Sequence, residues 1–323
     1  MEEGDIECHT LPPPVVPTIQ SMPQQESGVR RSRALPYEFY VHDEIYVHDA
    51  SKATVSLILS VNNTGLAGAP FVLFDVANIA TINPRQYAID SKKDITDSIP
   101  LTVSSNGIIS YDYSLFGANG FVRQFTGIID TTSLAASSRT SCSTSKALHA
   151  HVSLRYDYDI STGSSAIVLL LTNKKSSNTC IDLLTFVVTD NAYGLLHGEV
   201  KKVVVNSGQT IEYRIDTTAS GNWYDLSITV DDASDEVKHH VSDSIASSTS
   251  SSYFRRFMGR FETGQDSISD PAMGQGLHGL WNHRSEDQHP LIPTHMRHLQ
   301  RVETKHAEFD KDAKFYDDSK SEL

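Results

Sequence analysis

Three arginines lie inside apolar, strand-like segments, where a charged side chain needs a specific partner. Arg123 stands between two phenylalanines, and the pair Arg255 and Arg256 also stands between two. Guanidinium groups in this setting can stack on aromatic rings or pair with carboxylates of a neighbouring strand, here Asp112 and Asp225. Exposed, they would bind a phosphate instead. Because both halves of the chain repeat the pattern, we favour structural pairing and expect contacts between domains, with a phospholipid headgroup as the alternative ligand.

The nucleophiles, carboxylates and histidines of the sequence do not occur in the spacings of known catalytic, phosphate-binding or metal-binding motifs. The sequence contains no G-x-S-x-G, H-E-x-x-H or C-x-x-C motif and no glycine-rich phosphate loop. Asp231, Asp232 and Asp235 lack the spacing of an EF-hand. His149 and His151 would point the same way on a strand, and His239 and His240 have nonspecific spacing for a metal in a Ser-rich loop. His295 and His298 would share a helix face that could ligate a metal, but we favour a polar helix flank. We therefore assign no catalytic residue, no metal ligand and no cofactor-binding residue.

Composition narrows the function further. The 323 residues include 27 Lys plus Arg against 40 Asp plus Glu, a formal net charge of −13. This balance argues against nucleic acid and against a polybasic contact with an anionic membrane. No apolar run is long enough for a transmembrane helix, and no signal peptide begins the chain, so we expect a cytoplasmic protein as written. Cys8, Cys142 and Cys180 are too few and too scattered for a disulfide framework.

Short alternating segments predict that the chain is built from β-strands. Residues 55–61 alternate apolar and polar side chains, and Asn119-Gly120 joins two apolar runs as in a β-hairpin. No convincing helix separates these runs, which indicates an all-β fold of antiparallel sandwiches. The predicted strands are 55–61, 70–74, 111–116, 121–128, 150–156, 167–171, 183–188, 203–205, 211–215 and 226–230.

The two halves of the chain also resemble each other. A kernel of Tyr-Asp, a strand, a turn and a Phe-rich strand with arginine and glycine occurs at residues 111–127 and again at 224–259. Such an internal repeat indicates duplicated modules. We therefore predict two tandem antiparallel β-sandwich modules.

The composition along the chain suggests the domain boundaries. Residues 1–33 form a Pro-rich arm that we expect to be disordered, and 34–130 the first sandwich repeat. A Ser/Thr-rich linker at 131–146 leads to the second repeat at 147–274, with a disordered insertion at 231–252. The tail, 275–323, is charged and rich in histidine, and the apolar spacing between Met296 and Tyr316 predicts an amphipathic helix within it.

Several segments carry a family resemblance that covers about residues 34–274. They are residues 34–38, 84–87, 111–127 and 190–194, the run 254–264 (FRRFMGRFETG) and the run 267–274 (SISDPAMG). In this order they resemble the tandem C-terminal domains of bacterial-type, phosphocholine-specific, non-haemolytic phospholipase C.

The resemblance implies a non-catalytic role for this chain. In that family the phosphoesterase chemistry belongs to a large N-terminal domain similar to alkaline and acid phosphatases, and none of its residues can be assigned to a position here. We expect the C-terminal region of a phospholipase C-like enzyme that hydrolyses phosphatidylcholine-type phospholipids in lipid catabolism, inactive by itself. Its expected partners are a catalytic domain, in cis or in trans, and a phospholipid surface.

Two alternatives stay open. The chain could be a free-standing module that binds phospholipid headgroups or a protein partner. It could also be a fragment of a longer enzyme, since only a Pro-rich arm precedes the first sandwich.

Overall fold

The computed structural model describes residues 28–131, 134, 145–159, 161–175, 181–231 and 252–272. Within these ranges the chain is built from antiparallel β-strands, with only the short helices α2 (Lys146–His149) and η2 (Thr218–Ser220) between them. This confirms the all-β prediction. The cysteines, the histidine pairs at 239–240 and 295–298, the predicted tail helix, and most of the arm, linker and insertion lie outside the described residues.

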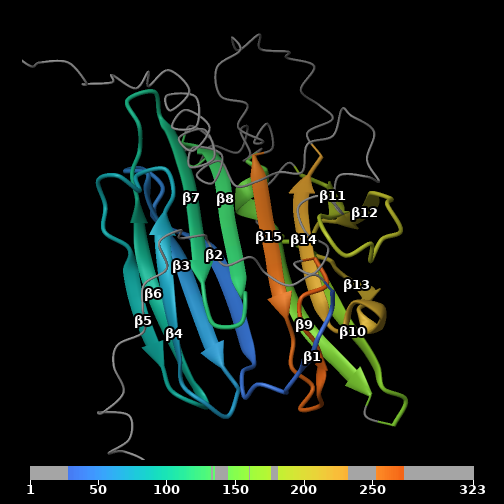
Figure 1. Ribbon diagram of the computed structural model, residues 1–323. Coiled ribbons are helices and arrows are strands. Elements are labelled where there is room, and N and C mark those ends of the chain that lie inside the picture. The colour runs from blue at the N-terminus through green and yellow to red at the C-terminus, as the bar shows by residue number, and fades with distance from the viewer. Residues whose placement is uncertain are drawn as a thin grey trace, which may run out of the picture.

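A single eight-stranded sheet runs through the molecule, in the order β12-β11-β14-β15-β8-β7-β4-β5 (Figure 1). Its strands in the first half are β4 (Ala69–Asp75), β5 (Arg85–Ile89), β7 (Ile108–Phe116) and β8 (Val122–Asp130). Those in the second half are β11 (Leu183–Asp190), β12 (Lys201–Asn206), β14 (Trp223–Val230) and β15 (Tyr253–Arg260). The halves meet where β8 pairs with β15, from Val122 opposite Met258 to Gly127 opposite Tyr253.

Two three-stranded sheets complete the two sandwiches. The first, in the order β2-β3-β6, contains β2 (Phe39–Asp49), β3 (Thr54–Asn63) and β6 (Lys93–Leu101). The second, in the order β13-β10-β9, contains β9 (Ala150–Asp159), β10 (Ser164–Asn173) and β13 (Thr210–Asp216). Each sandwich has its own buried hydrophobic cluster, the first around Phe71 and the second around Phe186.

The internal repeat is visible at the ends of β3 and β10, where each sandwich has a buried asparagine that forms hydrogen bonds to backbone carbonyls. Asn63 ends β3, and its side-chain amide donates to the carbonyls of Ala67, Ile89 and Asp90 at 2.8–3.2 Å. Asn173 ends β10 in the same way and donates to the carbonyl of Val205 at 3.1 Å. A buried amide that replaces ladder hydrogen bonds fixes the turn.

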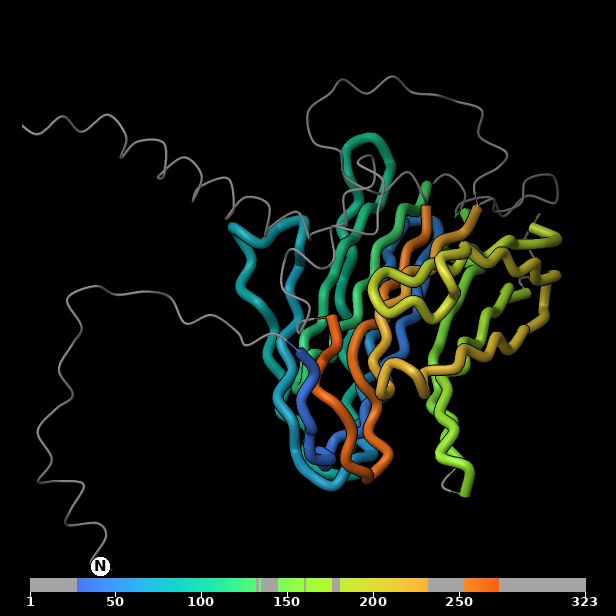
Figure 2. The backbone as a smooth tube through the Cα atoms, turned by 45° about the vertical axis from the view of Figure 1, so that its right-hand side comes forward, coloured from blue at the N-terminus to red at the C-terminus, as the bar shows by residue number. Residues whose placement is uncertain are grey.

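The first and last described segments lie together. β1 (Arg31–Ser32) pairs with β16 (Ser267–Ile268), and Figure 2 shows the first coloured segment, in blue, beside the last one, in orange. The indole nitrogen of Trp223 donates to the carbonyl of Ile268 at 3.1 Å, and Arg260 donates to the Ser32 hydroxyl at 3.1 Å. The ribbon of β1 and β16 is thereby attached to β14 and β15 of the eight-stranded sheet.

Candidate functional site: the arginines between the two sandwiches

Arg255 lies on β15, and its side chain reaches across into the first sandwich. Its Nε and Nη2 atoms donate to the two carboxylate oxygens of Asp43, on β2, at 3.0 and 2.5 Å. Nη2 also donates to the Tyr111 hydroxyl at 3.1 Å, and Nη1 to the carbonyls of Thr126 and Phe254 at 2.8 and 2.7 Å. The Arg255 and Asp43 side chains are only 2% and 4% exposed, so this is a buried, fully hydrogen-bonded ion pair.

The surroundings keep Arg255 charged. Burial by itself lowers the pKa of the guanidinium, but the charge of Asp43 and the nearby tyrosine hydroxyls raise that pKa well above its usual value. The ring of Tyr253 packs 4.1 Å from the guanidinium carbon. Burial correspondingly raises the pKa of Tyr111, which therefore stays a neutral phenol.

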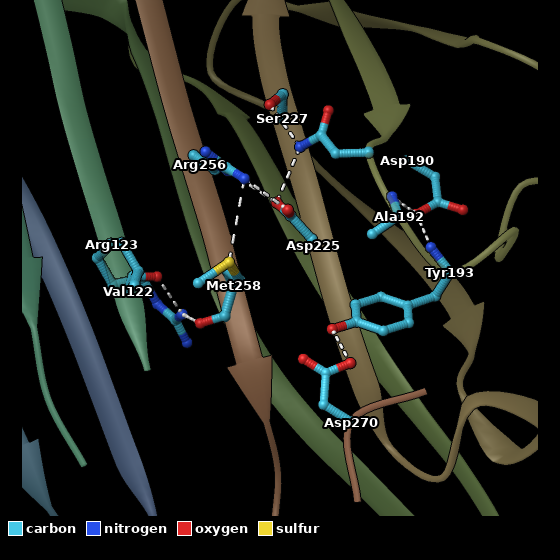
Figure 3. Close-up of polar contacts among 11 residues, drawn as sticks. Val122, Arg123, Asp190, Ala192, Tyr193, Asp225, Ser227, Arg256, Met258 and Asp270 are labelled. Atoms are coloured by element: carbon cyan, nitrogen blue, oxygen red, sulfur yellow. Dashed lines mark hydrogen bonds and ion pairs between the residues drawn. The ribbon is translucent and has the colours of Figure 1, made fainter. Parts of the chain in front are cut away.

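Arg123 makes the reciprocal contact from the first sandwich into the second. Its Nη1 atom donates to the carbonyls of Val122 and Met258 at 2.8 and 2.9 Å (Figure 3). Its Nη2 atom donates to the hydroxyls of Tyr224 and Tyr156 at 2.8 and 3.3 Å. Within the described ranges no carboxylate pairs with Arg123, which is 2% exposed.

Aromatic rings take the place of the missing carboxylate around Arg123. The guanidinium carbon lies 4.0 Å from the Phe121 ring centre and 5.2 Å from that of Phe257. A desolvated guanidinium gains most from such ring contacts. The two hydroxyls and two carbonyls accept hydrogen bonds from both Nη atoms, so the protein itself solvates that end of the guanidinium.

The two arginines are related by an approximate two-fold axis between β8 and β15. Each arginine donates to the carbonyl of the residue before it, Val122 or Phe254. Each also donates to a carbonyl on the other strand, three residues after the other arginine: Arg123 to Met258 and Arg255 to Thr126. Asp43 breaks this symmetry. In the strand register of the first sandwich, Asp43 lies opposite Leu59, which is four residues before Asn63. In the second sandwich, the residue opposite Leu169, four residues before Asn173, is Leu154. Leucine therefore occupies the position of Asp43 there.

Arg256 points to the opposite face of the eight-stranded sheet. Its Nε and Nη2 atoms donate to both oxygens of Asp225, on β14, at 2.8 and 2.6 Å (Figure 3). Asn191 donates to the same carboxylate at 2.9 Å. This is the carboxylate pairing expected from the sequence, and it leaves the Arg256 side chain 20% exposed.

Asp112, the other expected partner, pairs with no arginine in the described part of the chain. Gln124 occupies the place of Arg256 in the first sandwich, and Gln124 and Thr126 each donate to Asp112 at 3.1 Å. The pairing of Asp112 with Arg123 expected from the sequence is therefore wrong. The reason is alternation: Arg123 points between the sheets, while Gln124 points with Asp112 to the other face.

Asp112 provides a pH-dependent prediction. Burial raises the pKa of its carboxyl group, and the negative charge of Asp75 raises it further, against the hydrogen bonds from Gln124 and Thr126. A raised folded-state pKa means that the native state holds this proton more tightly than the unfolded chain. The tighter proton binding stabilises the native state at pH values below about 4, the usual pKa of an aspartate. That stabilisation is lost as the pH rises through the raised pKa of Asp112 in the folded protein. We expect Asp112→Asn to gain stability relative to wild type across that window.

Urea unfolding of both proteins from about pH 4 to pH 8 measures this difference. The exposed Asp94 on β6 supplies the control Asp94→Asn, which removes a surface carboxylate instead of a buried one. A difference for Asp112→Asn that does not change with pH would contradict the assignment.

The histidines His149 and His151 lie in α2 and at the start of β9. His149 is buried in α2, where its Nδ1 atom lies 3.3 Å from the carbonyl of Lys174, and burial lowers its pKa. No group of three metal-ligating side chains occurs among the residues that the structure describes. None of the described helices is long and apolar enough to cross a membrane.

Sequence reasoning missed Asp43, the counter-ion of Arg255. The two residues are 212 positions apart, so no local spacing connects them. A signal did exist: in β2 the inward positions run Phe39, Val41, Asp43, and the aspartate is the one charged residue among them. A carboxylate at an inward strand position calls for a buried cation.

Comparison with known proteins identifies the double sandwich. The family model described as bacterial phospholipase C, C-terminal domain, matches residues 31–128 and again 150–234, together more than half of the chain. The two matches coincide with the two halves of the repeat.

Curated relatives extend this match. The chain is 32% identical over 266 residues to the non-hemolytic phospholipase C of Pseudomonas aeruginosa, covering 82% of this chain and 32% of that protein. It is 33% identical over 260 residues to the non-hemolytic phospholipase C of Burkholderia pseudomallei, covering 80% of this chain and 30% of that protein. The chain thus spans about a third of the length of the curated relatives it matches. It belongs to the family of bacterial phospholipase C C-terminal domains.

Proposed function

We propose that this chain is the non-catalytic C-terminal region of a phospholipase C-type enzyme that hydrolyses phosphatidylcholine-type phospholipids, acting beside a catalytic domain in cis or in trans. The family match, which covers both sandwiches and corresponds to only about a third of each relative, carries the proposal. The lipid in question is inferred from the family resemblance of the sequence.

The way the charged groups are used supports a structural role for this region. The buried arginines Arg123 and Arg255 donate hydrogen bonds to carbonyls, phenols and Asp43 of the two sandwiches. A catalytic group must instead face a substrate with free hydrogen-bonding capacity. These two arginines lie at the junction, the place where β8 of the first sandwich pairs with β15 of the second, and they hold the two halves of one scaffold together.

The purified chain should release no phosphocholine from phosphatidylcholine vesicles above the rate without protein. A colorimetric assay for phosphocholine, with a bacterial phospholipase C as the positive control, measures this. Release by the chain at enzymatic turnover rates, about 1 per second or faster, would contradict the proposal.

The association with a catalytic domain is tested separately in source lysate, with an antibody raised against residues 35–274. A native band far above 35.6 kDa, the mass of this chain, supports a catalytic domain in cis. A band at 35.6 kDa that co-purifies phospholipase C activity supports association in trans. A band at that mass without such activity overturns the proposal.

A second candidate function, a free-standing module that binds phospholipid headgroups, is favoured by one observation. The first sandwich has an open cleft beside Arg85.

A further inference from the structure

The cleft lies at one end of the first sandwich, between its two sheets. It has a volume of about 170 Å³ and is open to solvent. Six of its lining residues carry the argument, and they come from β4, β5, β6, β7 and the loop that joins β4 to β5: Leu73, Asp75, Ile82, Arg85, Ile99 and Tyr113.

Opposite charges stand together inside this cleft. The phenol of Tyr113 lies close enough to both Asp75 and Arg85 to be influenced by each. Burial raises the Tyr113 pKa to about 12, Asp75 adds to that rise, and Arg85 opposes it. Arg85 is tied by Nη1 to Asp97 at 2.8 Å, its side chain is 45% exposed, and no described residue accepts a hydrogen bond from its Nε or Nη2 atoms. The Asp75 carboxylate accepts from the backbone and side-chain amides of Asn78 at 3.2 and 2.9 Å, which fixes its position in the cleft. The cleft thus presents guanidinium donors and a fixed negative charge to one ligand.

The loop between β4 and β5, which contributes Ile82 to the lining of the cleft, carries two exposed apolar side chains, here called the isoleucine rim. Ile79 and Ile82 belong to the loop between β4 and β5, and they are 53% and 51% exposed. Solvated isoleucines on a loop tip are costly in water, and they gain free energy when they enter an apolar phase. Ile82 itself lines the cleft, so the apolar rim and the charged interior form one surface.

The corresponding loop of the second sandwich is held differently. It joins β11 to β12 and inserts Leu196 into the second hydrophobic cluster, where Leu196 is only 4% exposed. In addition, Tyr193 of this loop donates to Asp270 at 3.0 Å, which ties the loop to the segment after β16 (Figure 3). The two copies of the repeat therefore differ in how this loop is held: one loop buries a leucine in the core, and the other exposes its isoleucines.

We propose that the cleft and its isoleucine rim bind the surface of a zwitterionic phospholipid bilayer. Arg85 receives the phosphate of one headgroup, Asp75 faces its ammonium group, and Ile79 and Ile82 enter the boundary between headgroups and acyl chains. The charge of the whole chain agrees with this choice, because a net charge of −13 opposes binding to an anionic membrane but not to a neutral one. The binding is local, through one loop and one headgroup.

This inference depends on the proposed function only for the choice of lipid, and it assigns the lipid contact to a different place from Arg123, Arg255 and Arg256. It can fail while the association with a catalytic domain holds, because that association is read from native size and co-purified activity.

Co-sedimentation of the full chain with phosphatidylcholine vesicles tests the inference. The double variant Ile79→Ser with Ile82→Ser should weaken binding by about tenfold or more, since it removes two side chains from the apolar phase. Arg85→Gln should weaken binding too, and free phosphocholine should compete where inorganic phosphate at equal ionic strength competes less. The matched control is Val200→Ser with Val204→Ser, which changes residues 53% and 52% exposed in the second sandwich and should leave binding unchanged.

Every variant sits at an exposed site, so equal urea midpoints for all of them show that folding is intact. Absence of binding by the wild-type chain overturns the inference. So does binding that requires anionic lipid and disappears at high salt, or binding that the isoleucine variant retains. A protein ligand of the same loop would also overturn the inference. In that case vesicles would not bind even to the wild-type chain, and the isoleucine variant would no longer bind the protein.

Discussion

Replacing Arg255 by methionine should lower the free energy of unfolding by about 3–5 kcal/mol, the cost of leaving one half of a buried ion pair without its partner. Asp43 would stay between the sheets with its two strongest donors gone, held at 4% exposure. Urea unfolding of the full chain, followed by tryptophan fluorescence and circular dichroism, measures the loss.

The double variant Asp43→Leu with Arg255→Met distinguishes a stranded charge from lost packing. Leu154 already occupies the position of Asp43 in the second sandwich, so leucine is compatible with the site. We expect the double variant to be more stable than Arg255→Met alone. An equally unstable double variant would show that packing, not charge, explains the loss.

Two comparisons calibrate this result. Arg123→Met should cost less than Arg255→Met, because Arg123 has no carboxylate partner to strand among the described residues. Arg155→Ala, which removes an ion pair to Glu212 with side chains 45% and 58% exposed, should cost less than about 1 kcal/mol.

Gly127→Ala should lower the free energy of unfolding by about 2–3 kcal/mol, through overpacking of the same junction. A Cβ atom on Gly127 would meet the Tyr111 ring at 2.5 Å from Cζ and 2.7 Å from Cε1. Tyr111 cannot move away freely, because it is 2% exposed and its hydroxyl accepts from Arg255 at 3.1 Å. The same urea unfolding experiment measures the effect.

The control for this variant is Gly68→Ala, where the nearest atom, the Asp90 Oδ1, is 3.5 Å from the added Cβ. That distance is an ordinary contact, so the change should be within about 1 kcal/mol of neutral. In a Tyr111→Phe background the cost of Gly127→Ala should fall, since the Tyr111 hydroxyl oxygen, the atom nearest to the added Cβ, is absent. Equal costs in both backgrounds would contradict a clash with Tyr111.

The pattern of apolar residues was enough to predict the central strands but not all of the fold. β3 was predicted from alternation and β10 from a continuous apolar run, and both contribute buried side chains to a core. β2 was missed because its run, FYVHDEIYVHD, carries charges on both faces, and one of those charges is the buried partner of Arg255. A local pattern cannot reveal that an inward carboxylate has its cation 212 residues away.

The candidate site was predictable to a similar extent. Arg123, Arg255 and Arg256 were recognisable because arginine is rare among phenylalanines on a strand. Which face each points to depends on register, and which sandwich each enters depends on the pairing of β8 with β15. That pairing joins two edges that the repeat itself makes equivalent, so no residue pattern within one half specifies it. The cleft was not predictable either, because it depends on whether a loop fills the end of its own sandwich.

The pairing of β1 with β16 makes the two ends of the double sandwich neighbours, with Arg31 opposite Ile268 and Ser32 opposite Ser267. Such a unit can be circularly permuted with a short connection, or inserted into a surface loop of another protein without stretching the host chain. A shuffled gene could therefore gain or lose this pair of sandwiches as one piece, since both ends leave the unit at the same point.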